Sequence, residues 1–341
     1  MYLFKNQIWL TISVLLTLTA CDIDGPTLPT SIDVFDGAAI ECKVSWNGII
    51  ATEVGNGAYQ FNPPIPMGVV VAANGCLDSD TGSELPELLG VSVTQETQAT
   101  QGNAAVISPI TKLIVEAAIS QDVSASGATS SRIRSGEITI STAVLESVTS
   151  SVVERLGLSD YKPTDPKTAN YIALAKDDLT GSQPESKVMR TSLALSALFK
   201  IIEISADSAD AEVVISEFSE AIAASGLPID LGVETDVDLL MATVKSNVPV
   251  GSPARQAIDL TEAAIIKIVP VISNAKGHID TAIAAAKTSA VFLNTATKTT
   301  VSSTSKLDVV IADAKQEITI AAAKITTACT FGVSVLGACT L

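Results

Sequence analysis

The spacing of apolar and polar positions in the first part of the chain is that of strands. Residues 40–44 alternate between apolar and polar side chains, as a half-buried strand does. The stretch 49–61 carries Gly-Asn-Gly in its middle, and Asn-Gly accepts the positive φ angles of a tight hairpin turn. The wholly apolar stretch 67–73 is typical of a buried strand. Residues 34–93 therefore predict a small antiparallel β-sandwich.

After residue 102 the apolar spacing becomes that of helices. Ser108 followed by Pro109 is typical of a helix start, because serine caps the first backbone N–H groups and proline lacks one. Helices are predicted from Pro109, over 140–156, from Pro166, and over 187–204 and 209–225. The polar stretch 121–136 predicts a loop or an exposed flap.

From residue 253 the composition shifts to Ala, Ile, Thr and Lys. Pro270 and Gly277 are the only helix breakers up to residue 327, so two or three long helices are expected there. The apolar positions over 311–325 indicate a narrow seam that packs against a neighbour.

The expected fold class is α+β, with a small antiparallel β-sandwich followed by a mainly α-helical body that has long C-terminal Ala-rich helices. The expected segments are a signal peptide (1–20), a tether (21–32), a β-sandwich domain (33–102), a helical domain (103–250), and a C-terminal long-helix segment with a cysteine-closed tail (251–341).

Composition removes several classes of function. The chain has 37 acidic and 21 basic side chains and a formal charge of −16, which excludes a nucleic-acid binder that uses a basic face. It holds a single histidine, His278, whereas most acid/base and metal chemistry uses histidine. His278 follows Gly277 and is expected at a helix start, exposed or capping. We therefore expect that the protein is not an enzyme and binds no cofactor. Catalysis by carboxylates alone, as in glycosidases, is the alternative that stays open.

The N-terminus reads as an export signal, with Lys5 ahead of the apolar stretch Ile8–Leu18. The sequence Leu-Thr-Ala-Cys that ends at Cys21 resembles the lipobox of bacterial lipoproteins, whose cysteine is acylated. This resemblance implies a membrane partner bound through acyl chains on Cys21. The alternative is an ordinary signal peptide followed by a chance cysteine. The outer membrane or the cell surface is the favoured location, and Asp22 keeps the inner membrane as an alternative because it resembles a retention signal.

Four further cysteines form an even set in an exported chain, where disulfides persist. Local geometry favours Cys42 with Cys76 and Cys329 with Cys339, among three connectivities. Free thiols or zinc ligands are the alternative, but the chain has no C-x-x-C spacing.

The segments 36–42, 52–61 and 74–82 are similar to the opening strand, the hairpin and the exit loop of an Ig-like or transthyretin-like (carboxypeptidase-regulatory-like) module of large bacterial surface proteins and lipoproteins. The segment 106–114 resembles the helix start that often follows this module. The resemblance implies an envelope or adhesion role and brings no catalytic residue.

Two aspartates, Asp78 and Asp80, alternate before Gly82 as at the start of a calcium loop. The later ligands of such a loop are missing, so a solvated turn is the alternative. No other residue set suggests a metal.

The sequence favours a non-enzymatic, lipid-anchored envelope protein that presents a surface for adhesion, assembly or partner contact, with a protein or an envelope polysaccharide as partner. The alternative is a periplasmic accessory or binding lipoprotein that holds a polysaccharide or peptide between the sandwich and the helices. Sugar binding would depend on Trp46, Tyr59 and Phe61 as an exposed aromatic platform.

Overall fold

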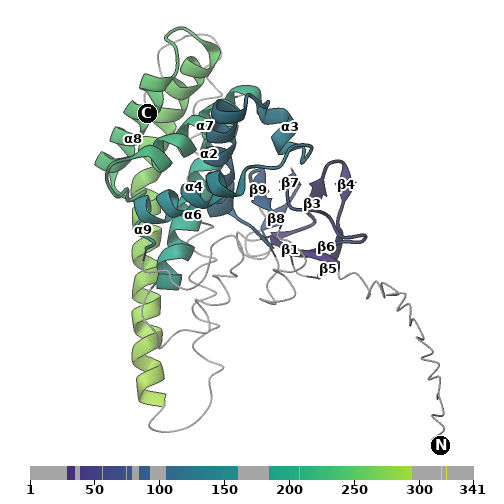
Figure 1. Ribbon diagram of the computed structural model, residues 1–341. Helices are drawn as coiled ribbons and strands as arrows, with labels where there is room; N and C mark the ends of the chain where they lie inside the picture. The colour runs from purple at the N-terminus through teal and green to yellow at the C-terminus, as the bar shows by residue number, and fades with distance from the viewer. Residues whose placement is uncertain are drawn as a thin grey trace, which may run out of the picture.

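The computed structural model shows an α+β protein in which ten strands precede seven helices within the described residues (Figure 1). The described residues are 29–34, 39–55, 57–73, 75–78, 84–92, 105–159, 184–206, 208–293, 316 and 320. The strands are β1 (Thr30–Val34), β2 (Ala39–Ile40), β3 (Lys43–Trp46), β4 (Ile49–Ile50), β5 (Thr52–Gly55), β6 (Ala58–Phe61), β7 (Val69–Ala73), β8 (Leu77–Asp78), β9 (Leu88–Val91) and β10 (Ala105–Ile107). The helices are α2 (Pro109–Ser126), α3 (Ser130–Arg134), α4 (Thr142–Arg155), α6 (Pro184–Ser205), α7 (Ser208–Ala224), α8 (Glu234–Asn247) and α9 (Pro253–Leu293).

Eight strands form two four-stranded sheets, and β2 pairs with β8 beside them. The first sheet has the order β10-β1-β6-β5 and the second has the order β4-β3-β7-β9. The predicted hairpin is confirmed as β5 and β6, with Thr52 opposite Gln60. The expectation of a wholly antiparallel unit is wrong at one pair, because β10 runs parallel to β1. β1 and β10 are far apart in the chain, as the crossover between two parallel strands requires.

The strand unit is longer than 33–102 at both ends. Thr30 belongs to β1 rather than to a tether, and its buried hydroxyl accepts a hydrogen bond from the Ile65 backbone N–H at 3.1 Å. At the other end β10 extends the first sheet to Ile107. The continuous strand expected over 40–44 is broken at Glu41, whose φ of 61° turns the chain from β2 into β3.

Side chains of the second sheet are buried on both faces. Val70 and Leu88 join the apolar cluster between the two sheets, while Val69 and Leu89 join the cluster formed by the helices. Successive residues of a strand point to opposite faces, so each of these neighbouring pairs divides between two cores. This explains why β7 and β9 are apolar throughout, and it makes the strands and the helices share packing.

Helix α2 is the central element of this shared core. Ser108 caps it in a capping box with Thr111, and the Thr111 hydroxyl also donates to the Leu89 carbonyl at 2.8 Å. Nearly every residue of its first ten is buried, as expected for a helix that is covered on all sides. Figure 1 shows α2 between the strands and the long helix α9.

The predicted helix start at Ser108 and Pro109 is confirmed, and α4, α6 and α7 occupy the other predicted ranges that the structure describes. The expectation of a loop over 121–136 is wrong. α2 continues to Ser126, where Gly127 ends it with a φ of 70°, and α3 follows. The serine hydroxyls of this stretch are accommodated because Ser124 and Ser126 donate back to carbonyls four residues earlier.

The helix α9 runs unbroken through Pro270 and Gly277, and the later part of the stretch to residue 327, where further long helices are expected, lies outside the described residues. Pro270 is exposed, while Ile268 and Ile272 on either side are buried, so the apolar face of the helix stays packed through the proline. His278 lies inside α9 and not at a helix start, which corrects that expectation. The first half of α9 belongs to the same apolar cluster as α6, α7 and α8, so no separate unit begins at residue 251. Helix α8 was not predicted.

Candidate binding cleft

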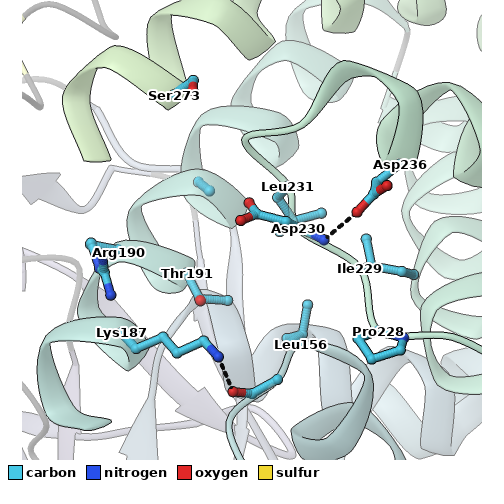
Figure 2. Close-up of a pocket in the computed structure, with 12 residues that line it drawn as sticks. Leu156, Lys187, Arg190, Thr191, Pro228, Ile229, Asp230, Leu231, Asp236 and Ser273 are labelled. Atoms are coloured by element: carbon cyan, nitrogen blue, oxygen red, sulfur yellow. Dashed lines mark hydrogen bonds between the residues drawn. The ribbon is translucent and has the colours of Figure 1, made fainter. Parts of the chain in front are cut away.

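A cleft of about 480 Å³ opens within the helical body (Figure 2). Its volume lies in the range of roughly 300 to 1,000 Å³ that is typical of small-ligand sites. The lining comes from the end of α4, the first turns of α6, the loop before α8, α8 and α9. The residues are Leu156, Gly157, Lys187, Arg190, Thr191, Ala194, Pro228, Ile229, Asp230, Leu231, Asp236 and Ser273.

One wall of the binding cleft carries two cations from α6. Lys187 and Arg190 are three residues apart, so they lie on the same face of the helix. The Lys187 ammonium donates to the Gly157 carbonyl at the end of α4, where a cation is favoured by the helix dipole. Gly157 has a φ of 63°, and a Cβ atom there would lie 2.8 Å from Lys187 Nζ. The close approach of this lysine therefore depends on glycine.

The opposite wall carries two carboxylates, Asp230 on a short loop and Asp236 in the first turn of α8. The Asp230 backbone N–H donates to Asp236 Oδ2 at 2.9 Å, and the Gly232 N–H donates to Asp230 Oδ1 at 2.8 Å. The Ile229 N–H donates to the Arg155 carbonyl at 2.6 Å, which fixes the loop to α4. The loop is therefore positioned before any ligand arrives. Figure 2 shows Asp230 between Asp236 and the α6 wall.

An apolar groove of about 430 Å³ lies next to the binding cleft and shares Pro228, Ile229 and Asp236 with it. Leu227 and Leu239 line this groove and are 68% and 65% exposed. The two spaces together offer charged groups of both signs and a nearby apolar surface.

A second set of charges links elements of the body around the buried side chains of Lys112 and Glu116. Lys112 of α2 donates to the Glu87 carbonyl and pairs with Glu203 of α6 at 3.2 Å. Glu116, one turn along α2, pairs with Arg134 of α3, whose Nε also lies 2.8 Å from Glu212 of α7. Because these partners come from different helices and strands, we infer that the charges hold the packed elements together and do not form a ligand site.

Burial changes the titration of the two carboxyls in this set. Removal of Glu116 from water raises its pKa to about 7, against the opposing effects of Arg134 and Lys112. Burial also raises the pKa of Glu203, although the Lys112 ammonium acts in the opposite direction.

The structure confirms one predicted site directly, because Cys42 and Cys76 form a disulfide between the β2–β3 and β7–β8 connections, at the end of the paired strands β3 and β7. Asp78 of the calcium hypothesis is buried in β8, paired with Ala39 of β2. The other predicted positions, Cys21, Asp80, Cys329 and Cys339, lie outside the described residues. In the part of the chain that the structure describes, no three His, Cys, Asp or Glu side chains are grouped to hold a metal ion.

The aromatic residues do not form the exposed platform that sugar binding would need. Tyr59 and Phe61 are fully buried, and the Tyr59 hydroxyl accepts a hydrogen bond from the Cys42 N–H at 2.9 Å. The Trp46 ring packs between the strands and the helices: a Cβ atom on Gly68 or Gly136 would lie 2.6 Å or 2.8 Å from its Nε1. The Asn47 N–H donates to the Ser135 carbonyl at the same junction.

No family model, curated protein or solved structure matches this chain. Its function is therefore inferred from its own residues. Among the described helices, none is both long enough and apolar enough to cross a membrane.

Sequence analysis missed the residues of the binding cleft. Lys187 and Arg190 fall inside a predicted helix, where charges ordinarily face water. The loop had a readable signal, because Asp-Leu-Gly at 230–232 is typical of a turn in which an aspartate accepts from the N–H two residues on. Nothing in the spacing indicated that this turn would face α6.

Proposed function

We propose that this protein is a non-enzymatic, lipid-anchored envelope protein that contacts a partner through its folded part. The lipobox-like sequence at Cys21 supports the anchor. The observation that carries the proposal is the buried disulfide between Cys42 and Cys76, because disulfides persist in the oxidising compartments outside the cytosol. Within this proposal the two sheets correspond to the Ig-like or transthyretin-like sandwich of bacterial surface proteins.

An exposed patch on the strand unit supports a role in partner contact. Ile49 and Ile50 of β4 and Val54 of β5 are 44%, 59% and 55% exposed. β4 and β5 are edge strands of their sheets, so their outer backbone groups are open to a partner. Exposed apolar side chains on edge strands are typical of an interaction surface. We call these three residues the β-edge patch.

Protease treatment of intact cells tests which way the protein faces. If it is an outward-facing contact protein, added protease removes it from whole cells while a periplasmic marker survives. The variants Ile50→Ser and Val54→Ser should then lower adhesion or assembly, whereas the matched surface variant Arg132→Gln should not. Unchanged adhesion or assembly in both β-edge variants would contradict the role of the patch.

The second candidate function is ligand binding by an accessory lipoprotein, and the binding cleft favours it. The cleft lies inside the helical body, not between the strands and the helices as sequence analysis expected. Its lining favours a peptide over a polysaccharide, because it offers charged groups of both signs and none of its described residues is an aromatic ring on which a sugar could stack.

A further inference from the structure

We propose that the apolar groove beside the binding cleft is the docking site of the chain's own C-terminal segment 311–325, which binds there as an amphipathic helix. This inference goes beyond the proposed function, because it needs neither the acyl anchor nor a ligand in the binding cleft. It gives a partner to the narrow apolar seam that the sequence predicts over these residues.

The apolar groove runs along one face of α8. Its residues on α8 follow the spacing of a single helix face and are Asp236, Leu239, Leu240 and Thr243. The other wall comes from the end of α7 and the loop after it, and its residues are Ala221, Ala224, Ser225, Gly226, Leu227, Pro228 and Ile229. Small side chains on α7 let a further helix approach closely, since the distance between packed helices depends on the side chains at the contact.

Two leucines on the sides of this groove are open to a partner. Leu227 in the loop is 68% exposed and Leu239 on α8 is 65% exposed. An exposed apolar groove between helices is a typical binding place for the apolar face of an amphipathic helix. The groove therefore suits a helix better than an extended strand.

The segment 311–325 has the apolar spacing that such a groove accepts. Isoleucine recurs every seven residues, and alanine lies between, so that the seam consists of Ile311, Ala314, Ile318, Ala321 and Ile325. Seven residues make about two helical turns, so these positions share one side of a helix. The isoleucines suit the spaces beside the small residues of α7, and the alanines let the helices approach each other.

Two residues within this segment are described, and they lie on its other side. Gln316 and Ile320 are helical and exposed, with Ile320 44% exposed. At about 100° per residue, both fall roughly 150° from the middle of the seam. This is the arrangement expected of a helix whose seam is covered.

The chain that follows α9 is long enough to return to the groove. Ser273 of α9 lines the binding cleft together with Asp236, and Asp236 also lines the groove. Leu293, where α9 ends, lies at most about 30 Å beyond Ser273. Residues 294–310 span up to about 55 Å when extended, so the segment can reach the groove of its own molecule. A linker of this length gives an effective concentration of about a millimolar, which favours the same molecule over a second copy.

Maleimide labelling of the full-length protein in detergent tests whether the groove is covered. Thr243→Cys places a thiol in the groove, and Ala242→Cys places one on the same helix outside it, both at exposed positions. We expect the thiol at position 243 to react about tenfold more slowly than the thiol at 242, as it does if the segment is docked about nine-tenths of the time. Mass spectrometry of the labelled peptides assigns each reaction to its position.

Variants of the segment identify it as the occupant. Ile318→Asp changes the seam and should make the thiol at position 243 as reactive as the thiol at 242. Ile320→Asp is the matched control, because Ile320 lies on the exposed side, and it should change neither rate. Circular dichroism should show that each variant folds.

Equal reactivity of the two thiols in the otherwise unchanged protein would show an open groove and overturn the inference. Slow labelling that persists in Ile318→Asp would mean that something else occupies the groove, and equal effects of the two aspartate variants would mean that the seam is not the contact. Slow labelling that disappears when the protein is diluted would assign the groove to a second copy. Each of these results overturns the inference and leaves the proposed anchor at Cys21 intact, since acylation is measured separately.

Discussion

At the scale of single residues, the buried carboxyl of Glu116 links stability to pH. Its pKa is about 7 in the folded protein and close to 4.5 in an unfolded chain, so the folded state binds this proton more tightly. The stabilisation is complete below the unfolded pKa and is lost as pH rises to the folded pKa. Between about pH 4.5 and 7 this group should therefore make the protein less stable as pH increases.

We predict that Glu116→Gln reduces the loss in the free energy of unfolding across that pH window by about 1 to 3 kcal/mol. Urea unfolding at a series of pH values measures it. Glu137→Gln is the matched control, because Glu137 is exposed and its pKa is lowered by Arg132, so its titration lies at more acidic pH. A Glu116→Gln variant with the wild-type slope would contradict the assignment.

Gly136 is a second residue at which we expect a substitution to lower stability. Its φ of 79° is unfavourable for other residues, and a Cβ atom would also lie 2.8 Å from Trp46 Nε1. We predict that Gly136→Ala costs about 2 to 4 kcal/mol and shifts the emission of Trp46. Gly251→Ala is the control for backbone strain alone, since its φ is 83° with no atom within 4 Å of the added Cβ. Equal losses in the two variants would show that the contact with Trp46 does not matter.

At the scale of elements, the disulfide between Cys42 and Cys76 closes a loop of 34 residues in sequence separation. The loop-closure model gives about 3 to 4 kcal/mol for such a loop. We expect the Cys42→Ala, Cys76→Ala double variant to lose about this free energy of unfolding in denaturant titration. The result should match that of the wild-type protein under reducing conditions, and a loss under 1 kcal/mol in both would contradict a stabilising role.

The elements that sequence analysis predicted correctly have strong local signals. The Ser108 cap and the Gly-Asn-Gly turn act over a few residues, and α4, α6 and α7 have regular apolar spacing. The errors occur where distant contacts decide the structure. Burial of Ile268 and Ile272 keeps α9 continuous through Pro270, and the pairing of Arg134 with Glu116 holds α3 where a polar loop was expected. The binding cleft could not be predicted, because it depends on which helices meet.

At the scale of the whole molecule, the shared packing around α2 predicts that strands and helices unfold together. Leu89 of β9 is fully buried against the helices. We expect Leu89→Ala to cost about 2 to 5 kcal/mol. It should also shift the Trp46 fluorescence transition and the helical circular dichroism transition to the same lower denaturant concentration. Leu88→Ala, which faces the other core, is the paired variant, and a shift of the fluorescence transition alone would show two independent units.

We propose above that acyl chains on Cys21 hold the whole molecule in the envelope. Metabolic labelling with a radioactive or alkyne-tagged fatty acid, followed by immunoprecipitation, measures this directly. We expect label on the wild-type protein and none on Cys21→Ser, which should accumulate as an uncleaved or slowly processed precursor. Equal labelling of the two proteins, or an unlabelled wild-type protein, would contradict it.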